Sequence, residues 1–192
     1  MSKDKDKNIK IIGIDPGTNV LGYSVIEVLN KSDITLHSLG VIQLDKFTDH
    51  YVKLQKIFEK LSFILKMYEP HEMAIEAPFY GKNAQSMLKL GRAQGVAIAA
   101  GMMQGLEVTE YAPRKIKQAI TGNGNASKQQ VSIMLQKMLK LDTMPKYFDA
   151  TDALGVAICH NLQRSSPLYK LGGGKAKNWK DFIKANPNKI KR

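Results

Sequence analysis

Two short, almost uninterrupted apolar segments constrain most strongly what this chain can fold into. IKIIGID, at residues 9–15, and MAIEAP, at residues 73–78, each read as a buried strand that ends near a carboxylate, and Pro16 or Pro78 then breaks the strand. Strands of this kind are typical of the inner, parallel part of a sheet. A buried charge costs several kcal/mol unless something pairs with it, so Asp15 and Glu76 both need a partner.

The remaining pattern completes an α/β chain. Alternating or apolar runs predict three further strands, at residues 21–28, 34–44 and 106–112. Helical spacing of apolar residues predicts helices from His50 to the stop at Pro70 and at residues 83–103, 114–120, 128–140 and 149–163. The order β-β-β-α-β-α-β-α predicts a mixed five-stranded sheet, antiparallel at one edge and parallel in the remainder, flanked by helices.

The composition changes at both ends of the chain. Residues 1–8 read as a flexible, solvated arm, and residues 9–163 carry the pattern of one folded domain. Residues 164–192 contain nine Lys or Arg, one acidic residue and three consecutive glycines, which is typical of a flexible basic tail.

Charge and cysteine content restrict the partners and the compartment. Twenty-nine Lys and Arg against 17 Asp and Glu give a net charge of +12, which favours nucleic acid first and an anionic membrane surface second. The single cysteine excludes an internal disulfide framework and a cysteine-rich zinc module. No apolar stretch is long enough to cross a bilayer, and the N-terminus lacks a signal-peptide pattern, so we expect a cytoplasmic protein.

Four carboxylates are candidates for a single site. If the two apolar strands are parallel neighbours, Asp15 and Glu76 converge at the sheet edge where such folds bind ligands. Asp149 and Asp152 lie three residues apart, on one face near the start of a helix. Oxygen ligands select Mg²⁺ or Mn²⁺, and two such ions about 4 Å apart can hydrolyse a phosphodiester. Each acid alone also fits a turn or a helix start, but together they indicate a metal-dependent nuclease.

With these residues identified, the chain closely resembles the RuvC family of bacterial Holliday junction resolvases, whose fold is ribonuclease H-like. The resemblance covers about residues 9–163. It is carried by four ordered motifs: GIDPGTNVLGYSVI, AIEAPFYGKNAQSMLKLGRAQGVAIAA, EYAPRKIKQAITGNGNASKQQV and DATDALGVAICH.

The resemblance implies a function for the four acids and a set of partners. Asp15, Glu76, Asp149 and Asp152 would be the catalytic ligands of two Mg²⁺ ions, for which Mn²⁺ could substitute. The expected enzyme is an endodeoxyribonuclease of DNA recombination and repair. It would act as a homodimer on four-way junction DNA, nick two strands of like polarity, and work with the RuvA-RuvB branch-migration complex.

DNA contacts are expected on the cationic and aromatic residues of the second and third motifs. Phe79, which composition alone would place in the core, would by resemblance stack on an unpaired base, with Tyr80 as a weaker candidate. The other expected contacts are Lys82, Arg114, Lys115, Lys117 and Lys128, and Lys89 and Arg92 extend the patch. Ser127 is expected to cap the helix that begins near Lys128.

Small residues at Gly91, Gly95 and Ala99 recur every fourth position of the expected helix 83–103. Packing within the chain is the first explanation of such a row. By resemblance, this helix can instead contribute to a dimer interface, and the sequence does not decide between the two. His160 is interpreted as a residue near a helix end, without a chemical role.

Three alternatives remain open on the residues alone. A strand followed by Asp-x-Gly-Thr also resembles the phosphate loop of the actin, Hsp70 and sugar kinase group, although those proteins need a second lobe. A nucleic-acid-binding module without catalysis is a second alternative, which four acids beside a polyanion disfavour. A different ribonuclease H-like nuclease is the third.

Overall fold

The computed structural model describes residues 8–30, 33–78, 83–143 and 147–164. The strands are β1 (Ile9–Asp15), β2 (Val20–Asn30), β3 (Asp33–Gln43), β4 (Glu72–Glu76) and β5 (Glu107–Tyr111). The helices are α1 (His50–Tyr68), α2 (Ala84–Met103), α3 (Pro113–Thr121), α4 (Lys128–Leu139) and α5 (Phe148–Arg164). Arg164, the first residue of the expected tail, is therefore the last of α5, and the rest of that tail and residues 1–7 of the arm lie outside the described residues.

The sheet has the strand order β3-β2-β1-β4-β5. β1 pairs with β2, and β2 with β3, in antiparallel fashion, whereas β1 with β4 and β4 with β5 are parallel. The mixed five-stranded sheet predicted from the sequence is therefore confirmed. The two apolar strands that carry Asp15 and Glu76 are parallel neighbours.

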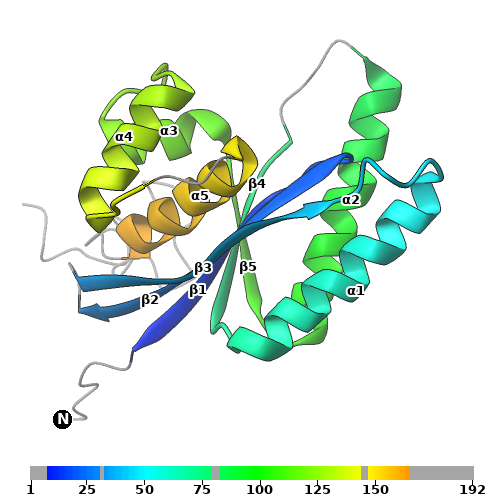
Figure 1. Cartoon of the computed structure of the whole chain (residues 1–192), viewed down its shortest axis with the longest axis horizontal. Coiled ribbons are helices and arrows are strands. Elements are labelled where there is room, and N and C mark those ends of the chain that lie inside the picture. Colours follow the sequence, from blue (N-terminus) through cyan, green and yellow to red (C-terminus); the bar gives the residue numbers. More distant parts are fainter. Residues whose placement is uncertain (1–7, 31–32, 79–82, 144–146, 165–192) are drawn as a thin grey trace, which may run out of the picture.

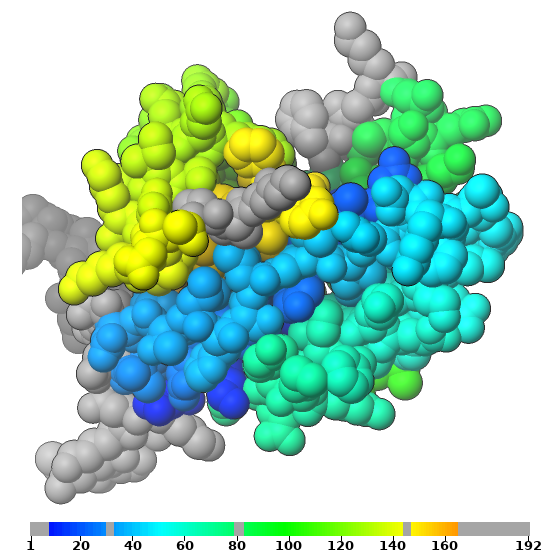
Figure 2. All heavy atoms as spheres, in the orientation of Figure 1, coloured from blue at the N-terminus to red at the C-terminus, as the bar shows by residue number. Residues whose placement is uncertain are grey.

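The helices form a layer on each face of the sheet (Figure 1). Ile12, Ile14 and Ile75 face a core shared with α1 and α2, while Ile11 and Ala74 face the core beneath α5. In Figure 2, β3 crosses the visible face between α1 on one side and α3 with α4 on the other. Among the described helices, none has the length and apolar character needed to cross a membrane.

Helix α5 lies directly on the backbone of β1 and β2 because two facing positions lack a side chain. A Cβ atom at Gly13 would stand 2.2 Å from the carbonyl oxygen of Ala153, and one at Gly22 would stand 2.0 Å from that of Asp149. The buried Ser24 hydroxyl donates a hydrogen bond to the Ala153 carbonyl at 3.0 Å. These contacts fix the height and position of α5 over the sheet.

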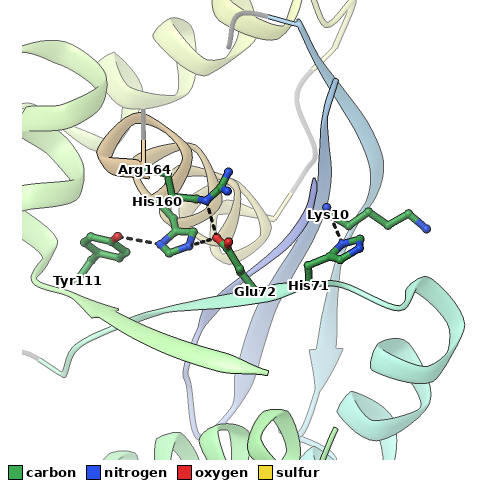
Figure 3. Close-up of polar contacts among 6 residues, drawn as sticks. All are labelled: Lys10, His71, Glu72, Tyr111, His160 and Arg164. Carbon is green, nitrogen blue, oxygen red and sulfur yellow. Dashed lines mark hydrogen bonds and ion pairs between the residues drawn. The ribbon is translucent and has the colours of Figure 1, made fainter. Parts of the chain in front are cut away.

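A polar network fastens the far half of α5 to the parallel strands (Figure 3). His160, only 2% exposed, lies 2.7 Å from a Glu72 carboxylate oxygen through Nε2 and 2.8 Å from the Tyr111 hydroxyl through Nδ1. Because a carboxylate only accepts, Nε2–H donates to Glu72, and Nδ1 of a neutral ring accepts from Tyr111. Arg164 Nε donates to the same Glu72 oxygen at 2.8 Å. His160 is therefore a buried link between α5, β4 and β5, not a simple helix-end residue.

We predict that Gly22→Ala destabilises the fold by about 1–3 kcal/mol or more, because the added methyl group meets backbone and cannot be relieved by a side-chain rotation. Urea denaturation followed by circular dichroism measures this loss. Gly40→Ala is the matched control on β3, since its methyl group meets only the end of the Tyr23 side chain. Equal losses for the two variants would contradict the close approach of α5.

Candidate active site

The alternation of β1 and β4 places Asp15 and Glu76 on the same face of the sheet. Ile14 pairs with Ile75 in the parallel register, so the next residues along, Asp15 and Glu76, are neighbours at the carboxyl edge. Because successive side chains point to opposite faces, both acids share the face of Gly13 and Ala74, which is the face covered by α5.

The first turn of α5 brings the other two acids to this edge. Gly22 pairs with Asp15 across β1 and β2, and the Asp149 carbonyl lies against Gly22. Asp152 follows one turn later and lines the same cavity as Asp15 and Glu76. Three of the four expected acids therefore line one cavity, whereas Asp149 does not line it and acts on Asp15 through its charge.

Burial and mutual repulsion shift the pKa values of the two strand acids. Burial, and then the charges of Glu76, Asp152 and Asp149, raise the pKa of Asp15 to about 8, against the opposing effect of Lys128. Burial and the charge of Asp152 raise the pKa of Glu76 to about 7. Both carboxyl groups therefore hold their protons to a higher pH than an ordinary Asp or Glu does.

Cationic side chains surround the acids. A cavity of about 670 Å³ is lined by Asp15, Glu76 and Asp152 and also by Arg114, Lys117 and Lys128. The Lys128 ammonium contacts Asp152 directly. Ser127 caps α4 by accepting the Gln130 backbone N–H, and the Gln130 side chain accepts the Ser127 N–H at 2.8 Å, so the expected cap is confirmed.

The other expected DNA contacts fall elsewhere. Lys115 does not line this cavity, because its ammonium lies over the Tyr111 ring, 5.2 Å from the ring centre. Phe79, Tyr80 and Lys82 lie outside the described residues, and their contacts with DNA stay a prediction.

The acids fit a divalent cation by donor type and by charge. Carboxylate oxygens are the ligands that Mg²⁺ and Mn²⁺ prefer, and a cation would relieve the repulsion that raises the pKa values of Asp15 and Glu76. Within the part of the chain that the structure describes, no three His, Cys, Asp or Glu side chains already stand as a ready metal site. A cation bound at Asp152 would compete with the Lys128 ammonium for that carboxylate.

The sequence reasoning missed the residues that support the site. Gly13 and Gly22 leave room for α5 to lie against the sheet. From the sequence alone, a glycine within a strand pattern indicates a bulge or a weak strand equally well. Gln94 is also buried in α2, donates to the Glu110 carboxylate at 2.9 Å, and lies 3.4 Å from the Glu76 carbonyl. A glutamine within an otherwise apolar helix face was the available signal for that contact.

The family model and the similar proteins of known name all carry the same family description. The family model described as crossover junction endodeoxyribonuclease RuvC matches residues 11–160. The chain is 54% identical over its whole length to the crossover junction endodeoxyribonuclease RuvC of Cytophaga hutchinsonii, covering 94% of that protein. It is 52% identical to the protein of the same name from Porphyromonas gingivalis, over 94% of this chain and 96% of that one.

Solved structures agree with this match. RuvC of Thermus thermophilus superposes with a TM-score of 0.74 at 28% identity, over 81% of this chain and 95% of that one. The yeast mitochondrial Holliday junction resolvase Ydc2, at 13% identity and a TM-score of 0.60, shares the fold. The ribonuclease H-like fold expected from the sequence is confirmed, and the chain belongs to the RuvC family of crossover junction endodeoxyribonucleases.

Proposed function

We propose that this chain resolves four-way DNA junctions by metal-assisted hydrolysis of phosphodiester bonds, with Asp15, Glu76, Asp149 and Asp152 as the catalytic acids. The observation that supports the proposal is that Asp15, Glu76 and Asp152 line one cavity with three cationic side chains, while the charge of Asp149 acts on Asp15. The T. thermophilus relative, 25% identical in its complex with a Holliday junction substrate, supports the choice of substrate. Family membership also argues against the actin-like alternative.

The proposed metal is Mg²⁺, with two ions in each site and Mn²⁺ as a substitute. When bound, these ions would activate a water molecule and stabilise the leaving oxygen. Asp15 and Glu76 hold their carboxylates on adjacent strands, while Asp149 and Asp152 supply theirs from one helix. The sheet and α5 would therefore hold these four residues at one edge of the molecule.

The cations of the cavity are proposed to bind the DNA backbone. Arg114 and Lys117 come from α3, and Lys128 stands at the start of α4, so the three approach the acids from one side. Without them the phosphates would meet only negative charge. Phe79 is proposed to stack on a base opened at the crossover, as the resemblance implies.

A homodimer is proposed to form through the exposed face of α2. Leu88 and Met102 on this helix are 63% and 64% exposed, and Ala99 is exposed between them. Apart from the helix's own backbone, no atom of the described residues lies within 4 Å of a Cβ added at Gly91 or Gly95. Packing among the described residues therefore does not explain this row of small residues, whereas a second copy of α2 could approach it closely. Two copies would supply two sites for paired nicks of like polarity.

The remaining expectations rest on family membership. We propose that the chain works in the cytoplasm and, by resemblance, with the RuvA-RuvB branch-migration complex. Its excess of 12 positive charges suits the DNA that these proteins share.

Asp15 makes the metal-free protein less stable as the pH rises. The folded state keeps a proton on Asp15 between the ordinary pKa of 3.8 and about 8, whereas the unfolded state releases it, so the free energy of unfolding falls through this window. In EDTA at pH 8 we expect Asp15→Asn to be more stable than the wild type by about 1–3 kcal/mol, and the gap to close towards pH 4.

Thermal and urea unfolding at several pH values measure this gap. Asp142→Asn, the same change at an exposed acid, is the control and should show no such trend. Saturating Mg²⁺ should raise the melting temperature of the wild type more than that of Asp15→Asn. If the wild type and Asp15→Asn have the same free energy of unfolding at every pH without metal, the raised pKa of Asp15 is contradicted.

The catalytic assignment predicts that Asp15→Asn keeps junction binding and loses junction cleavage. This variant should bind a synthetic four-way junction within about threefold of the wild type, because the lost charge is negative, yet cleave it at least about a hundredfold more slowly. Lys117→Gln should show the opposite pattern, with weaker junction binding. Its slope of log K against log salt should fall by the contribution of about one phosphate contact. Gel-shift and single-turnover cleavage assays measure both; full cleavage by Asp15→Asn would refute the assignment.

The dimer proposal predicts that Ala99→Glu yields a folded monomer, because two buried carboxylates would face each other across the contact. Sedimentation analysis gives the mass, and circular dichroism checks the fold. Gln118→Glu adds the same charge on exposed α3 and should leave the dimer intact. A dimeric Ala99→Glu, or a monomeric wild type, would be incompatible with an interface on α2.

A further inference from the structure

A second polar pocket lies where α1 and α2 begin, on the face of the sheet opposite α5; we name it the helix-start pocket. Its volume is about 240 Å³, and each of its lining side chains is polar. Thr18 and Asn19 from the loop after β1 and Thr48 from the loop before α1 form one side. It shares no lining residue with the cavity of Asp15, Glu76 and Asp152. Figure 1 shows the starts of both helices near the end of β1.

The first two turns of the two helices supply the rest of the lining. His50 and Lys53 come from α1, and Ser86 and Lys89 come from α2. Positive side chains at helix starts oppose the helix macrodipole, which favours negative charge there. Neither first turn carries an acidic residue. The acidic residue next to this positive charge is instead Asp49, the N-cap of α1.

His50 is an unsatisfied member of this group. Its Nε2 atom is buried and has no hydrogen-bond partner among the described residues. Burial, and then Arg92, Lys89 and Lys53, hold the pKa of His50 below its usual value. Asp49 opposes this effect, but its carboxylate already accepts the Val52 N–H as the cap of α1. A buried ring nitrogen among cations is a place where an anion would add a hydrogen bond and charge compensation.

One cation is held in position. Lys53 Nζ donates to the Asn19 side-chain oxygen at 2.8 Å. An ammonium group has three donors, and among the described residues no other hydrogen bond of this ammonium or of the Asn19 amide group is found, so their other donors are available to a ligand. The site therefore combines fixed charge with free hydrogen-bond donors.

We propose that the helix-start pocket binds one backbone phosphate of the DNA, through His50, Lys53 and Lys89. The pocket is smaller than those of drug-sized ligands and suits a single tetrahedral oxyanion. Among the described residues, the imidazole of His50 is the one aromatic side chain that lines it. The inference rests on the proposed function, since it assigns a further contact to the same DNA substrate.

The position of the pocket suits a strand that continues past the acids. Thr18 follows Asp15 by three residues, so their backbones lie within about 11 Å of each other. The acids lie on the α5 face of this edge, and the helix-start pocket lies on the α1 and α2 face. A DNA arm bound at both places would cross the carboxyl edge of the sheet.

The salt dependence of DNA binding tests the proposal. We expect the double variant Lys53→Gln, Lys89→Gln to bind a four-way junction about tenfold more weakly. The slope of log K against log salt should fall by about 0.9, the contribution of one phosphate. Lys60→Gln, Lys66→Gln is the matched control, with the same loss of charge at exposed positions farther along α1. An unchanged slope, or equal losses in both pairs, would overturn the proposal.

The imidazole of His50 provides a second, independent readout. Its NMR titration, assigned with His50→Asn, should show a raised pKa when duplex DNA or inorganic phosphate is added, and the Lys53→Gln, Lys89→Gln variant should abolish this response. No response to DNA, with cleavage of junctions intact, would overturn the inference and leave the proposed function standing. A response to phosphate in a protein that binds no DNA would overturn both the DNA assignment and the proposed function.

Discussion

The contact between α5 and the backbone of β1 and β2 is the constraint on which the rest of the structure depends. Gly13 and Gly22 let the helix lie against the sheet, and the Ser24 hydroxyl and the His160 network hold it there. If α5 stood a side chain's width farther away, Asp149 and Asp152 would leave the edge that Asp15 and Glu76 occupy. The packing of one helix thus determines whether the two aspartates of α5 lie near the two strand acids.

The acids in turn account for the charge of their surroundings. Burial beside like charges raises the pKa values of Asp15 and Glu76, so the cluster is stable only with protons, with Lys128 or with a metal. A DNA phosphate would add more negative charge, which the cations on α3 and α4 would offset. The same structure that makes the metal-free site unfavourable therefore makes it suited to cations and to a polyanionic substrate.

The sequence predicts the sheet, the helices and the four acids because each of them leaves a local pattern. IKIIGID and MAIEAP each place a carboxylate where the strand ends, and DATD places two more one helical turn apart. What the sequence does not predict depends on contacts between distant segments. Gly13 and Gly22 matter only because Ala153 and Asp149 come to lie on them, and His160 matters through Tyr111 and Glu72. The exposure of Gly91 and Gly95 likewise becomes visible only once the core-facing side of α2 is known.

The most direct test of the central claim is a comparison of four-way junction, linear duplex and RNA–DNA hybrid as substrates for the wild type, with and without Mg²⁺. The account predicts paired nicks in two strands of like polarity on the junction, only with the metal, and little cleavage of the other two. Preferential cleavage of the duplex or hybrid, or junction cleavage that persists in EDTA, would contradict it.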